Sequence, residues 1–337
     1  MHIQENVDLR HFNTFHVSAR ARWFVEITSI AELQDVLFWV RSRELPFMLI
    51  GQGSNILFKE DYPGLIIELN VKGITVAAET AEYVDVQVLC GENWHAFVRH
   101  CLDRGWYGLE NLSLIPGTVG AAPVQNIGAY GVEAKDRLLQ LEALEIATGE
   151  FRTFSNADCG FGYRDSVFKR ELRDRYVICR VVFRLSKQAQ LRLEYPALRE
   201  ALRGVAPEQL SPQLVSDTVC RIRSSKLPDH LRLGNAGSFF WNPRVSQAEF
   251  AALRTRYPDI VGYPVGENVK VPAAWLIERA GWKGYREGEV GVHSEHALVL
   301  VNHGGASGAE LVALSQKIQV SVREHFGIQL WPEVRII

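Results

Sequence analysis

The chain has 337 residues, which exceeds the size at which one hydrophobic core usually divides, so two or three domains are expected. Its charge is nearly balanced, with 37 Lys and Arg against 39 Asp and Glu, which gives no electrostatic basis for binding nucleic acid or an anionic membrane. The start lacks the layout of a secretory signal, and no apolar run nears the ~20 residues that span a bilayer. We therefore expect a cytoplasmic protein.

Cysteine and histidine spacing predicts no metal site and no disulfide framework. The five cysteines are odd in number and scattered, without a CxxC pair, so reduced and partly buried thiols are expected. They are Cys90, Cys101, Cys159, Cys179 and Cys220. The histidines include no HExxH spacing, so no metal catalysis is expected.

Strand and helix patterns alternate along the first half without repeating. Strands are predicted at 22–27, 47–51, 65–69, 83–90, 141–146 and 176–186, and helices at 30–43 and 92–105. Ser29 is a candidate N-cap for the first helix, and Gly105 ends the second. In the strand 83–90, three valines alternate onto one face, as expected of a half-buried strand.

The composition changes over 186–212, which is interpreted as an excursion or connection. Beyond it, a helix is predicted at 213–226, after Ser211-Pro212. The last third predicts helices at 273–281 and 307–327 and strands at 296–303 and 328–337. Ser307 and Glu310 form a capping box for the final helix, and Gly327 ends it. The pattern predicts an α+β protein of several domains.

Residues 111–131, NLSLIPGTVGAAPVQNIGAYG, are the most informative stretch. They hold four glycines and three alanines, so they offer little apolar surface to bury, and glycine loses much backbone freedom on folding. Close approach of the backbone to a flat or anionic ligand would compensate. The alternative is a flexible surface loop, which Ile115 and Val119 argue against by anchoring it, while Gln125 and Asn126 suit hydrogen bonds to a polar ring edge.

A second small-residue turn, GQGSN at 51–55, directly follows an apolar strand, where successive N–H groups can form an anion site. It lacks the third glycine of a Rossmann fingerprint and the Gly-Lys-Ser/Thr ending of a P-loop. Taken alone, a tight turn of no special function is the favoured interpretation. Together with 111–131, it favours a cofactor that carries a pyrophosphate.

Two loops carry candidate catalytic groups. In FGYRDS at 161–166, a fixed Arg164 suits stabilisation of negative charge on an oxygen, and a structural pair with Asp165 is an equally good interpretation. In GNAGSFF at 234–240, Ser238 is a candidate nucleophile or proton donor, although no GxSxG elbow surrounds it. The alternative is that Ser238 caps a helix.

The C-terminal strand has one apolar and one charged face. A period of two places Ile328, Leu330, Val334 and Ile336 on the first, and Trp331, Glu333 and Arg335 on the second. The charged face is either solvated or the edge of a cleft. Arg221, Arg223 and Lys226 share one predicted helix and either grip phosphate or form its exposed face.

Taken in order, IPGTVGAAPVQNIGAYG, FGYRDSVFK, KLPD, NAGSFFWNP and WPEVR resemble the UDP-N-acetylenolpyruvoylglucosamine reductase family of bacterial peptidoglycan synthesis. The resemblance runs from Asn13 to Arg335, and Tyr195 in the excursion 187–210 matches the tyrosine loop of type I members. It implies a vanillyl-alcohol-oxidase-type FAD-binding fold in two subdomains plus a C-terminal α+β substrate domain. The implied division is 1–71 with 327–337, then 72–226, then 227–326.

This resemblance also implies an NADPH-dependent flavoenzyme that reduces UDP-N-acetylglucosamine enolpyruvate to UDP-N-acetylmuramate. Hydride passes from flavin N5 to the vinyl carbon, Arg164 and Glu333 steady the enol, and Ser238 protonates the second carbon. To steady the enol, Glu333 must carry a protonated carboxyl. Burial favours the protonated form, and the nearby Arg335 opposes it. Ser238 must be positioned in a dry site, because serine is a poor acid in water.

The resemblance further assigns binding residues and partners. Contacts to FAD are implied for Gly51, Gly53, Ser54, Asn55, Gly117, Gly120, Asn126, Gly128, Arg223 and Arg335. Contacts to the substrate or NADPH are implied for Tyr163, Tyr195, Lys226, Asn242 and His296. Some relatives carry serines at Ala121 and Ala122, so any polar contact there must come from the backbone. A monomer is expected. The alternatives are another FAD oxidase or dehydrogenase of this fold, or a non-catalytic flavin-binding protein.

Overall fold

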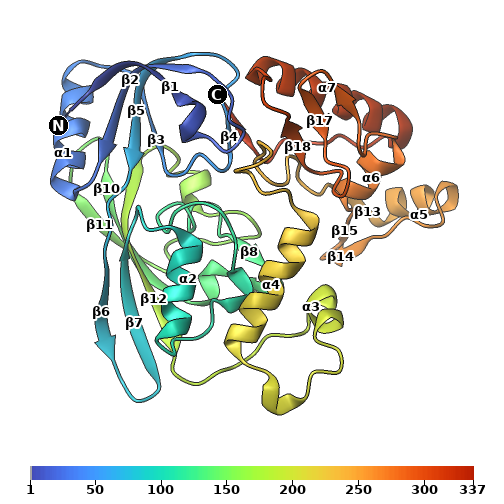
Figure 1. The fold of residues 1–337 in the computed structure, drawn as a ribbon, viewed down its shortest axis with the longest axis horizontal. Coiled ribbons are helices and arrows are strands. Elements are labelled where there is room, and N and C mark those ends of the chain that lie inside the picture. Colours follow the sequence, from blue (N-terminus) through green and yellow to red (C-terminus); the bar gives the residue numbers. More distant parts are fainter. Residues whose placement is uncertain (1) are drawn as a thin grey trace. The chain divides into compact units, whose positions relative to one another are not determined.

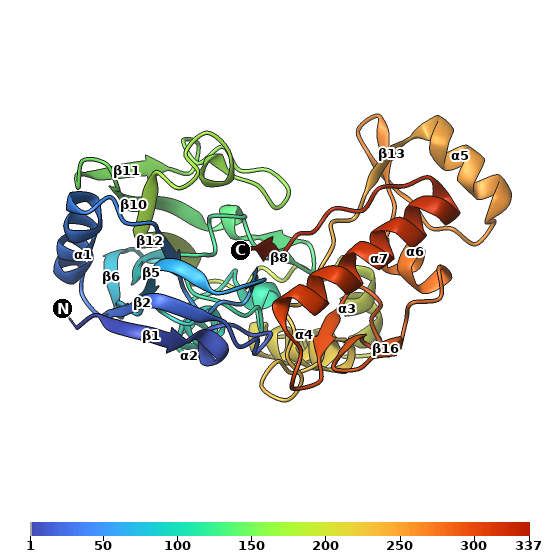
Figure 2. The same cartoon turned by 90° about the horizontal axis from the view of Figure 1, so that it is seen from above.

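The computed structural model describes residues 2–337, which form two compact units (Figures 1 and 2). The first comprises Trp23–Gln52 and Pro63–Ser224 with the N-terminal residues through Glu5. The second comprises Asn6–Arg22, Gly53–Tyr62 and Ser225–Ile337. Both contain helices and sheets, so the α+β class is confirmed. Within residues 2–337, no helix is long and apolar enough to span a bilayer.

Helices and strands are distributed along the whole chain (Figure 1). The helices are α1 (Ile30–Ser42), α2 (Trp94–Asp103), α3 (Pro196–Ala201), α4 (Pro212–Lys226), α5 (Gln247–Arg256), α6 (Ala273–Arg279) and α7 (Gly308–Phe326). The strands are β1 (Gln4–Asp8), β2 (Arg20–Ile27), β3 (Phe47–Ile50), β4 (Ile56–Leu57), β5 (Tyr62–Leu69), β6 (Ile74–Glu79), β7 (Tyr83–Leu89), β8 (Gly128–Ala129), β9 (Val132–Glu133), β10 (Leu138–Glu145), β11 (Phe151–Ser155), β12 (Tyr176–Ser186), β13 (Arg244–Ser246), β14 (Tyr263–Val265), β15 (Asn268–Lys270), β16 (Arg286–Glu287), β17 (Val290–Val292), β18 (Leu300–Asn302) and β19 (Arg335–Ile336).

One core of the first unit lies between α1 and a four-stranded sheet in the order β1-β2-β5-β3. β3 runs parallel to β5. The predicted Ser29 cap is confirmed: its side chain accepts from the backbone N–H of Glu32, and the Glu32 carboxylate accepts from that of Ser29. The apolar face of α1, with Leu33 and Leu37 buried, packs in this core. Because β3 ends at Ile50, the GQGSN turn follows a strand as predicted.

A second core lies against an antiparallel sheet in the order β11-β10-β12-β7-β6. α2 contributes Trp94, whose ring lies 5.7 Å from that of Phe183 on β12. Val84, Val86 and Val88 are fully buried, which confirms the predicted alternation of β7. Their neighbour Asp85 is also buried, because Arg184 binds its carboxylate through two hydrogen bonds of 2.7 Å. The predicted boundaries of the three domains stay a prediction, because the presence of two cores in this unit does not test them.

The second unit has a core of its own, built around α6 and α7 and two three-stranded sheets (Figure 2). The sheets have the orders β13-β15-β14 and β16-β17-β18. The predicted capping box of the last helix is confirmed, because the Ser307 side chain accepts from the Glu310 N–H. Gly327 ends α7 in the left-handed conformation, with φ of 71°. α7 packs on α6 and on the β16-β17-β18 sheet, and its buried residues include Leu311 and Ile318.

The prediction of one strand over 328–337 is wrong in extent. Only β19 at Arg335–Ile336 is a strand, and it pairs in parallel with β4. Upstream, Trp241 N–H donates to Trp331 O at 2.9 Å, so the chain exchanges one partner for another along this stretch. Pro332 has no N–H to donate, which prevents a continuous ladder. Leu330 and Val334 are buried as predicted, but Ile336 is 36 % exposed.

The cysteines behave as buried apolar residues, as their spacing predicts. Four of the five are buried, and Cys220 is partly buried. Burial raises the pKa of the Cys90 thiol to about 11. A thiol so disposed is a poor nucleophile near neutral pH.

Candidate functional site

The segment 111–131 is held firmly in the first unit by the first turn of α2. Trp94 Nε1 donates to Leu112 O at 2.9 Å, and Trp94 N donates to Gly117 O at 3.0 Å. Between them, the backbone N–H of Leu114 donates to Nδ1 of His95 at 2.9 Å. A segment secured at three points over six residues is not a flexible loop, so that alternative is wrong.

Strained backbone gathers in this region. Leu114, Asn126 and Tyr130 have φ of 58°, 44° and 49°. Arg164, in the FGYRDS loop of the same unit, has φ of 54°. Residues other than glycine rarely adopt such backbone angles, and each one costs about 1–3 kcal/mol. Such strain concentrates where a binding or catalytic geometry requires it.

Gly51 and Gly120 are needed for close packing within the protein, which the sequence alone did not indicate. A Cβ on Gly120 would lie 2.5 Å from Cβ of Cys90, and one on Gly51 would lie 2.7 Å from Oγ1 of Thr118. These close approaches are to the protein rather than to a ligand. Gly117 is different, because its φ of 110° is one that L side chains seldom adopt.

The side chain of Asn126 is fully buried and fully engaged by protein groups. Its Nδ2 donates to Glu133 Oε2 at 3.0 Å and to Gly162 O at 2.9 Å. Its Oδ1 accepts from the backbone N–H of Lys135 at 3.1 Å. Asn126 thus ties the glycine-rich segment to the loop that carries Arg164, and any contact that it makes to a cofactor comes from its backbone.

Replacing Asn126 by glycine is expected to lower the free energy of unfolding by about 2 kcal/mol, because three buried hydrogen bonds are lost while the positive φ stays allowed. Asn126→Asp should cost more, since a carboxylate would face Glu133 and Gly162 O. Urea unfolding of the three proteins measures both effects. A glycine variant as stable as the parent would contradict this account of the network.

Arg164 points its guanidinium back to the glycine-rich segment. Its Nη2 donates to Gly128 O at 2.7 Å, and its Cζ lies 5.8 Å from the ring centre of Tyr163. Asp165 is bound by Arg170, which follows this loop in the chain. The loop is closed by backbone hydrogen bonds between Gly162 and Asp165. Arg164 is therefore half-buried in a fixed turn.

The tyrosine excursion packs against the same segment. The rings of Tyr195 and Tyr130 meet edge to face, with centroids 5.1 Å apart and planes at 73°. Nearby, the buried Asn111 donates to Tyr130 O at 2.9 Å and to Arg192 O at 2.8 Å. Tyr195 stays 45 % exposed. Its side chain therefore lies partly at the surface, beside the glycine-rich segment.

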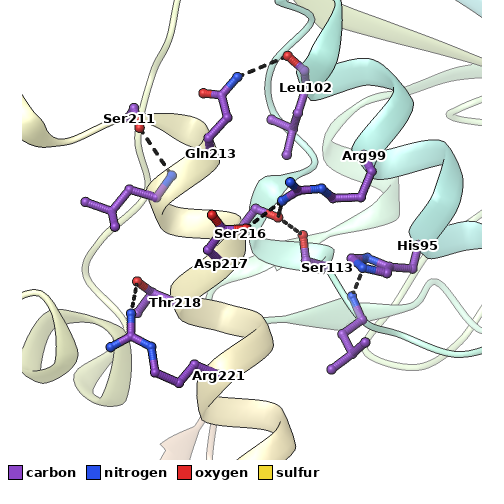
Figure 3. A network of polar contacts seen from close by, with 12 residues as sticks. His95, Arg99, Leu102, Ser113, Ser211, Gln213, Ser216, Asp217, Thr218 and Arg221 are labelled. Carbon is purple, nitrogen blue, oxygen red and sulfur yellow. Dashed lines mark hydrogen bonds and ion pairs between the residues drawn. The ribbon is translucent and has the colours of Figure 1, made fainter.

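Arg223 on α4 also reaches this segment, through a hydrogen bond of 3.2 Å from Nε to Leu114 O. Burial lowers the pKa of its guanidinium, and the nearby Arg164 lowers that pKa further. Arg223 thus brings a partly buried cation to the glycine-rich segment. By contrast, Arg221 is exposed and donates to Thr218 Oγ1 on its own helix at 3.0 Å (Figure 3).

In the second unit, backbone pairing brings Ser238 and Glu333 onto neighbouring segments. Glu333 N donates to Phe239 O at 2.8 Å, next to Ser238. Ser238 itself forms a bridge with Val299, so it is not a helix cap and that alternative is wrong. Its Oγ has no hydrogen-bond partner among residues 2–337. The hydroxyl is thus half-buried and available for chemistry.

The last residue of the GQGSN turn, Asn55, contacts the same C-terminal stretch. Asn55 Nδ2 donates to Glu333 O at 3.4 Å, and Arg335 N donates to Asn55 O at 3.0 Å. Gly53 has φ of 61°, and a Cβ there would meet Phe12 O at 2.1 Å. The second unit therefore assembles Gly53, Ser54, Asn55, Glu333, Arg335 and Ser238 from three distant stretches of chain. The predicted convergence of Arg164 with Ser238 and Glu333 stays a prediction, because Arg164 belongs to the first unit.

Several residues that support this group had no role assigned from the sequence. Thr14 N donates to Gly53 O at 3.2 Å, and Asn235 N donates to Thr14 O at 2.9 Å. The buried Asn302 donates from Nδ2 to Phe15 O at 2.8 Å. A signal was present in the sequence, because an asparagine ending the apolar run HALVLVN is unusual unless it is hydrogen-bonded.

Lys226 and His296, predicted to meet substrate or NADPH phosphates, both lie in the second unit. Burial lowers the pKa of His296, and Lys226 lowers it further. Asn242 has a structural contact, since its Oδ1 accepts from Ala273 N at 2.9 Å at the start of α6. His293 and His296 have the spacing HxxH, but within residues 2–337 no cluster of three metal-ligating side chains is present.

Comparison with known proteins finds family matches in both halves of the chain. Residues 21–155 match the FAD binding domain family, and residues 229–337 match the family described as UDP-N-acetylenolpyruvoylglucosamine reductase, C-terminal domain. The chain is 49 % identical over 339 residues to the UDP-N-acetylenolpyruvoylglucosamine reductase of Chromobacterium violaceum, covering 100 % of this chain and 99 % of that protein. It is 47 % identical over 334 residues to that of Pseudomonas aeruginosa, covering 99 % and 98 %.

A solved structure supports the fold. The crystal structure of the Thermus caldophilus reductase aligns with a TM-score of 0.70 at 24 % identity, covering 99 % of each chain. With the FAD-binding match, it confirms the predicted flavin-binding fold followed by a C-terminal α+β domain. The similarity to these reductases extends over the whole chain. The protein belongs to the UDP-N-acetylenolpyruvoylglucosamine reductase family.

Proposed function

We propose that this protein oxidises NADPH and reduces UDP-N-acetylglucosamine enolpyruvate to UDP-N-acetylmuramate in the cytoplasm. The family membership and the FAD-binding match support a flavin reductase. The observation that carries the finer assignment is the Ser238–Glu333 pair, which backbone pairing holds on neighbouring segments with a serine hydroxyl left available. A proton donor and a second acidic group side by side suit reduction of a carbon–carbon double bond beside a carboxylate.

Bound FAD would supply hydride to the terminal vinyl carbon of the enolpyruvyl group. The added electron pair then lies on the second carbon and the carboxylate, and the protein must stabilise that charge before a proton arrives. Arg164 binds the carboxylate, because its guanidinium is fixed by Gly128 O and by the turn around it. Glu333 hydrogen-bonds the enol oxygen, and Ser238 delivers the proton to the second carbon.

FAD would be bound mainly by backbone groups. The fit rests on the turn at Gly53 and the strained run from Leu114 to Tyr130, whose backbone is held by the protein on one side. Arg223 supplies a partly buried cation for the pyrophosphate. Gly51 and Gly120 contribute by letting the protein chains approach closely. We assign Asn55 and Arg335 to the same cofactor.

The substrate's sugar nucleotide would be held by Tyr163, Tyr195, Lys226, Asn242 and His296. Of these, the exposed Lys226 and the neighbouring His296 provide positive charge and a hydrogen bond for a diphosphate. Tyr195 sits on an excursion that packs on Tyr130, which suits a group that covers bound substrate. NADPH would occupy the same region in an earlier step and leave before the substrate enters. All the residues that we assign to the site come from one chain, and we propose a monomer.

The purified protein is expected to be yellow and to consume NADPH quickly only when the enolpyruvyl sugar nucleotide is present. Absorption of bound flavin and NADPH oxidation with and without that acceptor measure this. Rapid turnover with oxygen alone would indicate an oxidase of the same fold. Bound flavin without turnover of either acceptor would indicate a binding protein, and each of these results would overturn the proposal.

A further inference from the structure

The turn at Leu114, where the glycine-rich segment begins, is held by side chains from two helices. Its N–H donates to Nδ1 of His95 on α2 at 2.9 Å. Its carbonyl accepts from Nε of Arg223 on α4 at 3.2 Å. The φ of Leu114 is 58°, which a leucine adopts only when its surroundings enforce it. His95 and Arg223 are thus the two groups that hold this strained peptide.

The surrounding contacts leave the turn little freedom (Figure 3). The hydroxyls of Ser113 and Ser216 lie 2.8 Å apart, and both residues are fully buried. Arg99 on α2 donates to Ser216 Oγ at 3.1 Å and to Asp217 Oδ1 at 2.7 Å, which joins α2 to α4. Figure 3 shows His95 one turn from Arg99, on the side of α2 that faces Ser113. Arg223 is consequently fixed with respect to the segment it touches.

The contact between His95 and Leu114 defines the protonation of the ring. A backbone N–H can donate only to a ring nitrogen that carries no proton, so Nδ1 is unprotonated. A neutral ring therefore carries its proton on Nε2. Burial lowers the pKa of His95, and the charges of Arg99 and Arg223 lower it further. Asp217 pairs with Arg99 rather than with the imidazole. The ring is therefore neutral near pH 7.

We propose that neutral His95 is a positioning residue, which holds the Leu114 turn and, through it, Arg223 and the segment 115–120 in the arrangement that binds FAD. The proposal rests on the assignment of this segment and Arg223 to the cofactor. Protonating His95 removes the acceptor for the Leu114 N–H and adds a cation beside two arginines. The affinity for FAD should therefore fall as the pH drops through the pKa of His95, which lies below its ordinary value.

The test compares His95→Leu, which removes the acceptor, with His95→Asn, whose Oδ1 can take the place of Nδ1 without titrating near neutral pH. FAD released on dilution of the purified holoprotein, followed by its fluorescence between about pH 5 and pH 8, gives the dissociation constant. At pH 8 the leucine variant should bind FAD about tenfold more weakly, and the asparagine variant within about threefold of the parent. The parent should lose affinity in acid, and the asparagine variant should not.

His100→Leu is the matched control, because His100 lies on the same helix and contacts Arg104 rather than the glycine-rich segment. It should leave the dissociation constant and its pH dependence unchanged. An asparagine variant that binds FAD as weakly as the leucine variant would overturn the inference. So would a leucine variant that binds FAD as tightly as the parent, or a parent whose affinity for FAD does not change with pH. A parent that binds no FAD at all would overturn the proposed function as well, which separates the two failures.

Discussion

Replacing Ser238 by alanine is expected to leave a folded, yellow protein that NADPH reduces normally but that passes electrons to the enolpyruvyl substrate about 10²–10⁴-fold more slowly. The side chain can be removed at little cost, because its Oγ has no partner among residues 2–337 and the backbone bridge to Val299 remains. The expected loss is confined to the step that needs a proton. Stopped-flow absorption of the flavin measures the two half-reactions separately.

Ser307→Ala is the control for this variant, since it removes a hydroxyl of the same unit that has a structural contact. Ser307 caps α7, so its loss should cost about 1 kcal/mol of stability and leave both half-reactions unchanged. Equal slowing of both half-reactions in Ser238→Ala would argue against a proton donor. An unchanged rate of substrate reduction would remove Ser238 from the mechanism.

Local signals in the sequence predicted the elements that local chemistry controls. The capping boxes at Ser29 and Ser307 are explicit in the sequence and appear as hydrogen bonds. The alternation of β7 was predicted from its valines. Elements without such signals were not predicted, among them β6, which is exposed along most of its length, and the short α3 within the excursion. Their position follows from pairing and packing with distant parts of the chain.

The C-terminal stretch shows why strand length was overestimated. A period of two describes side-chain direction, but it carries no information about which neighbour each residue pairs with. Here Trp331 pairs with Trp241, while Arg335 pairs with Ile56. Such an exchange of partners is a property of the assembled unit, and Pro332 was its one local sign.

The candidate site was predictable as a set of residues but not as a network. Arg164 and Ser238 could be selected by chemical type and by the family resemblance. The hydrogen bonds of Asn126 could not, because its three partners lie 7 to 36 residues away and two of them are backbone groups. The same holds for His95, whose acceptor role depends on the ring nitrogen that faces Leu114. Direct contact and support of a contact are indistinguishable in sequence alone.

Glu333→Gln is expected to slow reduction of the substrate about 10²–10³-fold while flavin reduction by NADPH stays at the parental rate. The main chain at this residue is held on both sides, by Phe239 O and by the Asn55 side chain, so the backbone should keep its place when the carboxyl is replaced. An amide keeps a hydrogen-bond donor but cannot be a full acid, so Glu333→Ala should be slower still. The two half-reactions and the KM for the sugar nucleotide, measured for both variants, test this order.

The matched control is Glu324→Gln, which neutralises an exposed carboxylate on α7 and should change neither half-reaction. A hydrogen bond made chiefly to the enol, and only weakly to the ground-state carboxylate, lowers kcat more than it raises KM. If instead KM rises and kcat is unchanged in Glu333→Gln, the carboxyl binds the substrate uniformly and takes no part in stabilising the enol. Unchanged turnover in both Glu333 variants would leave Arg164 as the group that must stabilise the developing charge.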